Sequence, residues 1–169
     1  MKLETVYFDS PGPQNTDEVL RLAKKVAAQE GIEDIILATT RGYTGLKALE
    51  VFKGKSVVRV GSYRSRSEPA RMQEFQEKGG KLIYAFEDVQ YDYPRSVQSE
   101  YRAIAGEGGK VCPEVVLAAV KAGLIEEGKR VIGIGGTFPG ADTAFVIISA
   151  SDFSSIKIES IICTPRRNK

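Results

Sequence analysis

Apolar runs alternate with helical repeats along the first half of the chain. Runs rich in β-branched and aromatic residues predict strands at 5–8, 32–38, 56–60 and 81–86. Apolar side chains at helical spacing predict three helices, from Asn15 or Thr16 to Gly31, from Gly42 to Gly54, and over 69–78. Strands and helices that alternate in this way form a parallel sheet with helices on both faces.

The second half of the chain follows a different pattern. A polar, tyrosine-bearing loop at 87–95 precedes a predicted helix over 96–105, and another helix is predicted from Pro113 to Gly123. Three strand candidates follow, at 130–135, 144–149 and 156–163, with no helix-length segment between them. Because a parallel pair needs a longer crossover, we expect at least the last two strands to pair antiparallel.

Length and composition predict a single α/β domain over residues 1–169. The 169-residue chain is 42% hydrophobic and 27% charged, which excludes a disordered or fibrous protein. A formal net charge of +2 gives no general attraction to nucleic acid or to an anionic membrane, so we expect neither partner. The chain has no histidine, which excludes Ser-His-Asp and Cys-His catalysis and His-ligated zinc.

The two cysteines, Cys112 and Cys163, are too few for a disulfide framework or a four-thiolate zinc site. Free cysteines of this kind usually pack as small apolar groups, which favours a structural role and a reducing compartment. No apolar run approaches the ~18 residues of a membrane span, and no signal-peptide core follows Met1. We therefore expect a cytoplasmic protein without a metal site.

A first candidate site lies at 38–45, between the carboxyl end of a predicted strand and the start of a predicted helix. Ligands of open α/β sheets bind at this edge. Thr39, Thr40 and Thr44 offer hydroxyl groups, while Gly42 lets the backbone approach a ligand. With the free amides of the helix N-terminus, the segment can cradle a phosphate. Threonine and glycine also serve as plain helix caps, and that alternative stays open.

Two further loops are candidates for binding. The segment 133–143 holds four glycines and joins two predicted strands, although a hairpin needs only about two to five loop residues. It also carries Thr137, Asp142 and Thr143. The segment 10–16 leads into the first predicted helix. A long hairpin connection and a simple N-cap are the alternative interpretations of these two loops.

Short motifs stand in a fixed order along nearly the whole chain. They are Val6-Tyr7-Phe8 with Pro11-Gly12 and Asn15-Thr16, then Lys110-Val111-Cys112, Gly135-Gly136, Gly140-Ala141-Asp142-Thr143-Ala144 and Ile161-Ile162-Cys163-Thr164-Pro165-Arg166. In this order the chain resembles the C-terminal α/β domain of pyruvate kinase, which also occurs alone in a family of small archaeal and bacterial proteins. Only the stretch 61–98 diverges, so no contacts are carried over from it.

The resemblance implies a three-layer α/β/α sandwich around a five-stranded mixed sheet of order 3-2-1-4-5 with one antiparallel strand. Kinase activity is not expected, because it belongs to a barrel of about 250 residues. In the parent enzyme the counterpart of 39–44 holds an effector phosphate; here Arg41 stands where serine is expected, and the chain has no tryptophan. Structures of the stand-alone family are associated with flavin mononucleotide (FMN), which implies that the same cradle receives its phosphate.

Taken together, the loops and the resemblance predict a protein that binds a phosphorylated small molecule, FMN first, at the carboxyl edge of the sheet. A flavin-dependent enzyme is one alternative. A ligand-sensing or homo-oligomerisation module is the other, because the parent domain also makes subunit contacts. The residues expected at the site are Gly12, Asn15, Thr16, Thr39, Thr40, Arg41, Gly42, Thr44, Gly135, Gly136, Thr137, Gly140, Ala141, Asp142 and Thr143.

Overall fold

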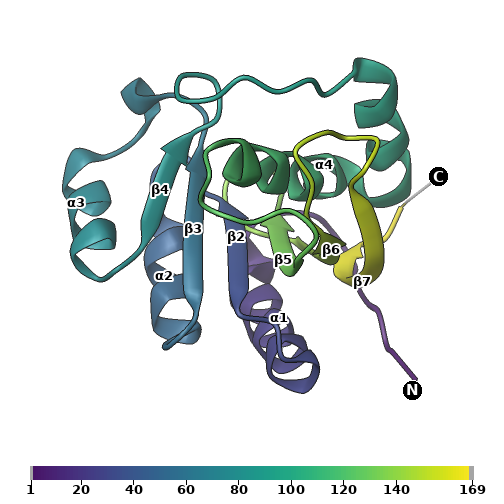
Figure 1. Ribbon diagram of the computed structural model, residues 1–169. Helices are drawn as coiled ribbons and strands as arrows, with labels where there is room; N and C mark the ends of the chain where they lie inside the picture. Colours follow the sequence, from purple (N-terminus) through teal and green to yellow (C-terminus); the bar gives the residue numbers. More distant parts are fainter. Residues whose placement is uncertain (1, 168–169) are drawn as a thin grey trace.

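A mixed β-sheet forms the centre of the structure, a computed structural model that describes residues 2–167 (Figure 1). Its strands are β1 (Val6–Phe8), β2 (Asp34–Ala38), β3 (Ser56–Gly61), β4 (Lys81–Tyr84), β5 (Arg130–Gly135), β6 (Thr143–Ile148) and β7 (Lys157–Pro165). Each one coincides, within a few residues at its ends, with a strand candidate in the sequence. The apolar centres of β2 and β5 are buried on both faces, as expected of inner parallel strands.

The strand order is β1-β7-β6-β5-β2-β3-β4, and β6 alone runs against the other strands. The sheet thus has seven strands, and the five implied by the resemblance are wrong. Counted from β2, the strands β2 to β6 do follow the order 3-2-1-4-5. The two additional strands have a physical reason: β6 is buried along almost its whole length, so β7 must pair with its outer edge, and β1 then pairs with β7.

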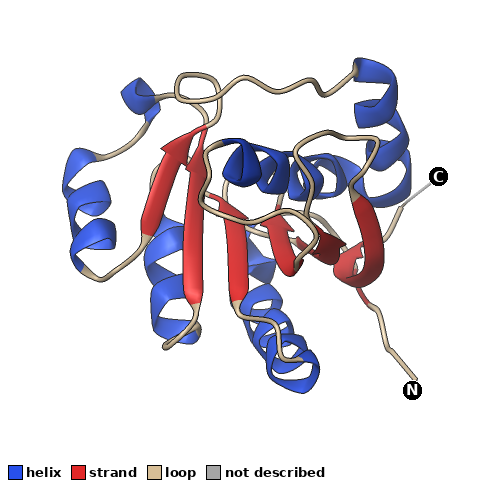
Figure 2. Cartoon of the chain, in the orientation of Figure 1, coloured by secondary structure: helices blue, strands red, loops and turns tan. Residues whose placement is uncertain are grey.

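Helices cover both faces of the sheet (Figure 2). One face packs against α1 (Thr16–Glu30), α2 (Tyr43–Val51) and α3 (Pro69–Glu77), and the other against α4 (Arg95–Lys121). Two short 3-10 turns, η1 (Pro13–Asn15) and η2 (Arg64–Arg66), complete the elements. The protein is therefore a mixed α/β fold. Within residues 2–167, no helix combines the length and apolar character needed to cross a membrane.

The long helix α4 contains the predicted helix over 96–105 in its first part, but its second part begins earlier than the sequence predicts. Its backbone kinks at Ala105 and Gly106, where φ is −141° and 69°, and it is helical again well before Pro113. Pro113 therefore lies inside a helix and does not begin one, which corrects the prediction. At Gly108, close to the kink, a Cβ would lie 2.2 Å from Oγ1 of Thr143. Glycine lets this turn of α4 pack directly against β6.

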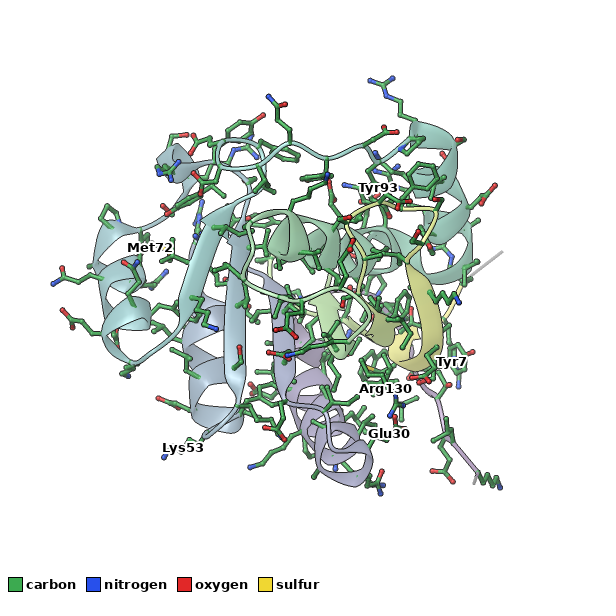
Figure 3. The ribbon with its side chains drawn as sticks, viewed as in Figure 1. Tyr7, Glu30, Lys53, Met72, Tyr93 and Arg130 are labelled. Atoms are coloured by element: carbon green, nitrogen blue, oxygen red, sulfur yellow. The ribbon has the colours of Figure 1, made fainter. Side chains whose placement is uncertain are left out.

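Opposite edges of the sheet have different character. At the amino edge, Arg130 forms ion pairs with the buried carboxylate of Glu30 and, over 2.7 Å, with the exposed carboxylate of Glu159. Arg130 and Glu30 lie beside each other in Figure 3. At the carboxyl edge, β2 and β5 end side by side, since they pair in parallel with Leu37 opposite Ile134. The loops that follow these two strands are therefore neighbours, as the strand order implied by the resemblance requires.

Candidate functional site

A cavity of about 640 Å³ opens at the carboxyl edge of the sheet. Its lining comes from the loop before α1, the turn between β2 and α2, the start of α3, the middle of α4, and the loop between β5 and β6. Its volume lies within the range of about 300 to 1,000 Å³ that is typical of small-molecule sites. The three loops nominated by the sequence all contribute to it.

The predicted site residues divide into two groups. Those that line the cavity are Thr16, Thr39, Thr40, Arg41, Thr44, Gly136 and Gly140. Those that lie behind the lining are Gly12, Asn15, Gly42, Gly135, Thr137, Ala141, Asp142 and Thr143. The second group includes the residues that hold the loops in place, as the hydrogen bonds below show.

The turn at 39–44 leaves donor groups free. Thr39 is buried, and its Oγ1 accepts the amide of Gly42 at 3.1 Å, which closes the turn. No acceptor within residues 2–167 meets the amides of Tyr43, Thr44 and Gly45, the first turn of α2. The side-chain hydroxyl of Thr44 likewise makes no hydrogen bond in this part of the chain and lines the cavity. Amides and a hydroxyl at a helix N-terminus suit an oxyanion.

Gly42 lets α3 approach this turn. Its φ of 90° lies in the left-handed region, and a Cβ there would lie 2.2 Å from Cε of Met72 and 3.2 Å from Cβ of Arg71. Met72 is labelled on α3 in Figure 3. The close packing places Arg71 at the cavity, where its guanidinium is 2.8 Å from Glu68.

Charged side chains around the cavity are positive on balance. The lining contains three cationic and two acidic residues, Arg41, Lys47, Arg71, Glu68 and Glu107, for a formal charge of +1. Lys47 forms an ion pair with Asp17 at 2.6 Å, and this hydrogen bond raises the pKa of Lys47, which stays charged. Arg41 is exposed and forms no ion pair within residues 2–167. A guanidinium without a carboxylate partner is available to an anionic ligand.

The loop at 136–143 is held by a buried carboxylate. Asp142 is 1% exposed, and its Oδ2 accepts the amides of Gly12 and Thr137, both at 3.1 Å. Its Oδ1 accepts the hydroxyl of Thr143 at 2.8 Å. One side chain therefore ties the loop before α1 to the loop between β5 and β6. Asp142 connects the loops of the cavity wall and is not itself part of the lining.

A second contact joins the same two loops. Oγ1 of Thr16 accepts the amide of Ala141 at 3.0 Å. Next to it, Gly140 has a φ of 82°, and a Cβ there would lie 2.7 Å from both Cα of Pro13 and Oγ1 of Thr16. Glycine is needed both for the backbone conformation and for the close approach.

Two aromatic side chains at the cavity were not among the predicted site residues. Phe138 and Tyr43 both line it, and they are 67% and 60% exposed. Phe138 stands inside the glycine-rich loop that the sequence nominated, so its position could have been included. Lys47 follows Thr44 by about one helical turn, so the sequence could have predicted that both lie on the same face of the helix. Arg71 had no such signal, because its place depends on how α3 packs.

A smaller hollow of about 360 Å³ lies by the loop after β4 and is less suited to a ligand. Its buried carboxylate, Glu114, is already paired with Nζ of Lys110 at 2.7 Å and accepts the hydroxyl of Tyr91 at 3.1 Å. Burial raises the pKa of Tyr91, so this phenol remains neutral. These groups satisfy one another, in contrast to the free donors of the larger cavity.

Both cysteines are buried and free. Sγ of Cys112 donates a weak hydrogen bond to the carbonyl of Thr143 at 3.7 Å, from the middle of α4 and not from a helix start. Burial raises the pKa of Cys112 well above its usual range and raises that of Cys163 to about 12. Both sulfurs are therefore neutral thiols near neutral pH, in keeping with the predicted structural role.

No model of a known protein family matches the sequence. The chemistry of the site therefore rests on its own geometry. Free amides, free hydroxyls and a positive rim at the start of α2 can bind an oxyanion, and the exposed rings of Tyr43 and Phe138 can contact an apolar group attached to it.

Proposed function

We propose that this protein binds the phosphate group of a small phosphorylated molecule in the cavity at the carboxyl edge of the sheet, with FMN as the first candidate. One observation carries the proposal: the first turn of α2 lines the cavity, and its amides and the hydroxyl of Thr44 have no hydrogen-bond partner within residues 2–167. Unpaired donors at a helix N-terminus are stabilised by a negative charge.

The rest of the cavity supports a ligand larger than inorganic phosphate. A volume of about 640 Å³ leaves room for more than one anion. Phe138 and Tyr43 expose ring surface at its rim, and a flat ring system would cover this surface. The choice of FMN among such ligands rests on the resemblance to stand-alone pyruvate kinase C-terminal domains.

The first experiment is an absorbance spectrum of protein purified without added ligand, followed by calorimetric titration of stripped protein with FMN and riboflavin. Riboflavin lacks the phosphate. We expect it to bind at least about a hundredfold more weakly, because it forfeits several charge-assisted hydrogen bonds. Equal affinities for the two flavins would contradict a phosphate cradle. Binding of other phosphate esters in preference to FMN would keep the cradle and replace the candidate.

A charge-reversal pair tests the location. Arg41→Glu places a carboxylate at the cavity, whereas Lys53→Glu makes the same change in charge at an exposed residue outside the lining. Lys53 is labelled far from the carboxyl edge in Figure 3. Arg41→Glu should weaken binding of inorganic phosphate about tenfold or more, and Lys53→Glu less than about twofold. Similar losses in both variants would mean that the anion binds elsewhere.

A further inference from the structure

Arg59 on β3 is a buried cation without a carboxylate. It is 0% exposed, and no ion pair within residues 2–167 involves it. Charged groups are almost never buried fully unless an opposite charge accompanies them, because desolvation of an ion is costly. A positive charge therefore lies in the interior, and residues 2–167 supply no negative partner for it.

The guanidinium of Arg59 binds backbone carbonyls of the 39–44 turn. Its Nε donates to the carbonyl of Thr39 and its Nη2 to that of Thr40, both at 2.9 Å. The ring of Tyr84 lies 4.7 Å from its Cζ. A Cβ on Gly61 would come within 2.5 Å of Nη2, so the neighbouring glycine makes the space for this arrangement. Nη1 is buried and has no hydrogen-bond partner in the described part of the chain.

These two hydrogen bonds set the direction of the next amides. In a trans peptide the C=O and the following N–H point in opposite directions. Because the carbonyls of Thr39 and Thr40 point at Arg59, the amides of Thr40 and Arg41 point away from it. Both residues line the cavity, and neither amide has an acceptor within residues 2–167. By binding these two carbonyls, Arg59 orients the amides of Thr40 and Arg41 in the 39–44 turn away from β3.

We propose that Arg59 is a positioning residue of the anion site, and that its buried charge is balanced when a phosphate group binds in front of the 39–44 turn. This inference rests on the proposed function. It adds that the ligand must carry a negative charge at this turn, and that affinity depends on a side chain which the ligand does not touch. A purely structural clamp between β3 and the turn would affect folding stability and leave the affinity of folded protein unchanged.

The experiment compares the affinity for inorganic phosphate of the wild type, Arg59→Met, Arg59→Lys and Arg64→Met, each shown to be folded by circular dichroism. Arg64→Met is the matched control, because Arg64 also lies over the Tyr84 ring, at 4.5 Å, but is exposed and paired with Glu87 and Asp88. Arg59→Met should raise the dissociation constant at least about tenfold, which corresponds to about 1.4 kcal/mol. Arg59→Lys keeps the charge and should show an intermediate loss. Arg64→Met should change it less than about twofold.

The outcomes separate the two proposals. If the wild type binds neither inorganic phosphate nor FMN nor any other phosphate ester, the proposed function fails, and the role of Arg59 fails with it. If the wild type binds and both Arg59 variants bind equally well, only the role of Arg59 is overturned. If neither Arg59 variant folds, the role of Arg59 is tested instead by the NMR signal of its Nε–H in the wild-type protein. A shift of that signal and slower hydrogen exchange on saturation with phosphate support the inference, and an unchanged signal overturns it.

Discussion

The 39–44 turn and the 136–143 loop follow adjacent strands, both contain glycine and threonine, and both line one cavity, yet the protein holds them in place through different groups. In the turn, the carbonyls of Thr39 and Thr40 are bound from behind by Arg59, and amides toward the cavity are left free. In the loop, side chains of the protein accept the amides of Thr137 and Ala141, whereas the amides of Gly136, Phe138 and Gly140 meet no acceptor within residues 2–167. The turn is thus held through its carbonyls, and the loop is held to the segment before α1 through its own Asp142 and the amide of Ala141.

This difference teaches that residue type alone does not identify a binding loop. Threonine in the turn and threonine in the loop have the same hydroxyl, but that of Thr44 is free while that of Thr143 donates to Asp142. What distinguishes them is where each hydrogen bond goes. Substitutions in the wall should therefore act on stability, and substitutions in the turn on affinity.

Asp142→Ala should have the largest effect. It leaves two amides, a hydroxyl and the connection between two loops without their shared acceptor, so we expect a loss of about 4 kcal/mol in the free energy of unfolding. Urea denaturation followed by circular dichroism measures it. Asp142→Asn keeps one acceptor oxygen for the amides, and the Thr143 hydroxyl can rotate to accept from the new amide group, so its loss should be clearly smaller. Equal losses would contradict the role of the carboxylate as a multiple acceptor.

Gly140→Ala should cause the second-largest loss in the free energy of unfolding. The left-handed backbone costs an alanine about 1 kcal/mol, and the contacts with Pro13 and Thr16 should bring the loss of stability to about 2 to 3 kcal/mol. Gly31→Ala is the control, since Gly31 has a φ of 66° and would place its Cβ in open space. The difference between the two variants isolates the contact. If they lose the same amount, the loop is free to move away from α1.

A pair of threonine variants compares the wall and the turn directly. Thr16→Val leaves the buried amide of Ala141 without an acceptor and should cost about 1 to 1.5 kcal/mol of stability. Thr44→Val removes a hydroxyl that has no partner, so stability should change by less than about 0.5 kcal/mol, while affinity for inorganic phosphate should fall about fivefold. Urea denaturation measures the stability of each variant, and calorimetric titration measures the affinity of each for inorganic phosphate. An affinity loss in Thr16→Val that exceeds that in Thr44→Val would reverse the assignment.

Much of this arrangement could be predicted from the sequence. All seven strand candidates correspond to strands, because their apolar runs are bounded by glycine, proline and helical repeats. The helix from Thr16 to a left-handed Gly31 also followed from local signals. The five-stranded sheet was wrong because the strand count was taken from the resemblance and not from the seven local patterns. The helix expected to begin at Pro113 was wrong because proline was read as a start signal, whereas the backbone is helical again directly after the kink at Ala105 and Gly106.

The site was predictable only where its residues are local in sequence. Thr39, Thr40 and Thr44 lie in one turn after one strand, so their type and position indicated an oxyanion cradle. Arg59 could not be found in this way, because its carbonyl partners are about twenty residues away on a neighbouring strand and turn. Asp142 was included as a residue of the glycine-rich loop and of a motif of the resemblance, but its function as a shared acceptor depends on the loop at 10–16, which only the folded chain brings to it.

The smallest expected effect near neutral pH concerns the cysteines, whose reactivity shows whether solvent reaches the protein interior beneath the 136–143 loop. Cys112 lies beneath the 136–143 loop, with its sulfur against the carbonyl of Thr143, and burial raises the pKa of Cys163 to about 12. We therefore expect no measurable labelling of folded protein by iodoacetamide at pH 8, and full labelling of both thiols in denaturant. Because the pKa of Cys163 is higher in the folded state than in the unfolded chain, folding stability is greatest at a pH where the thiol of the unfolded chain is still protonated. Stability should accordingly fall as the pH rises from about 9 toward 12. Rapid labelling of Cys112 at pH 8, suppressed by inorganic phosphate, would show that the wall opens and would place a reactive group beside the cavity.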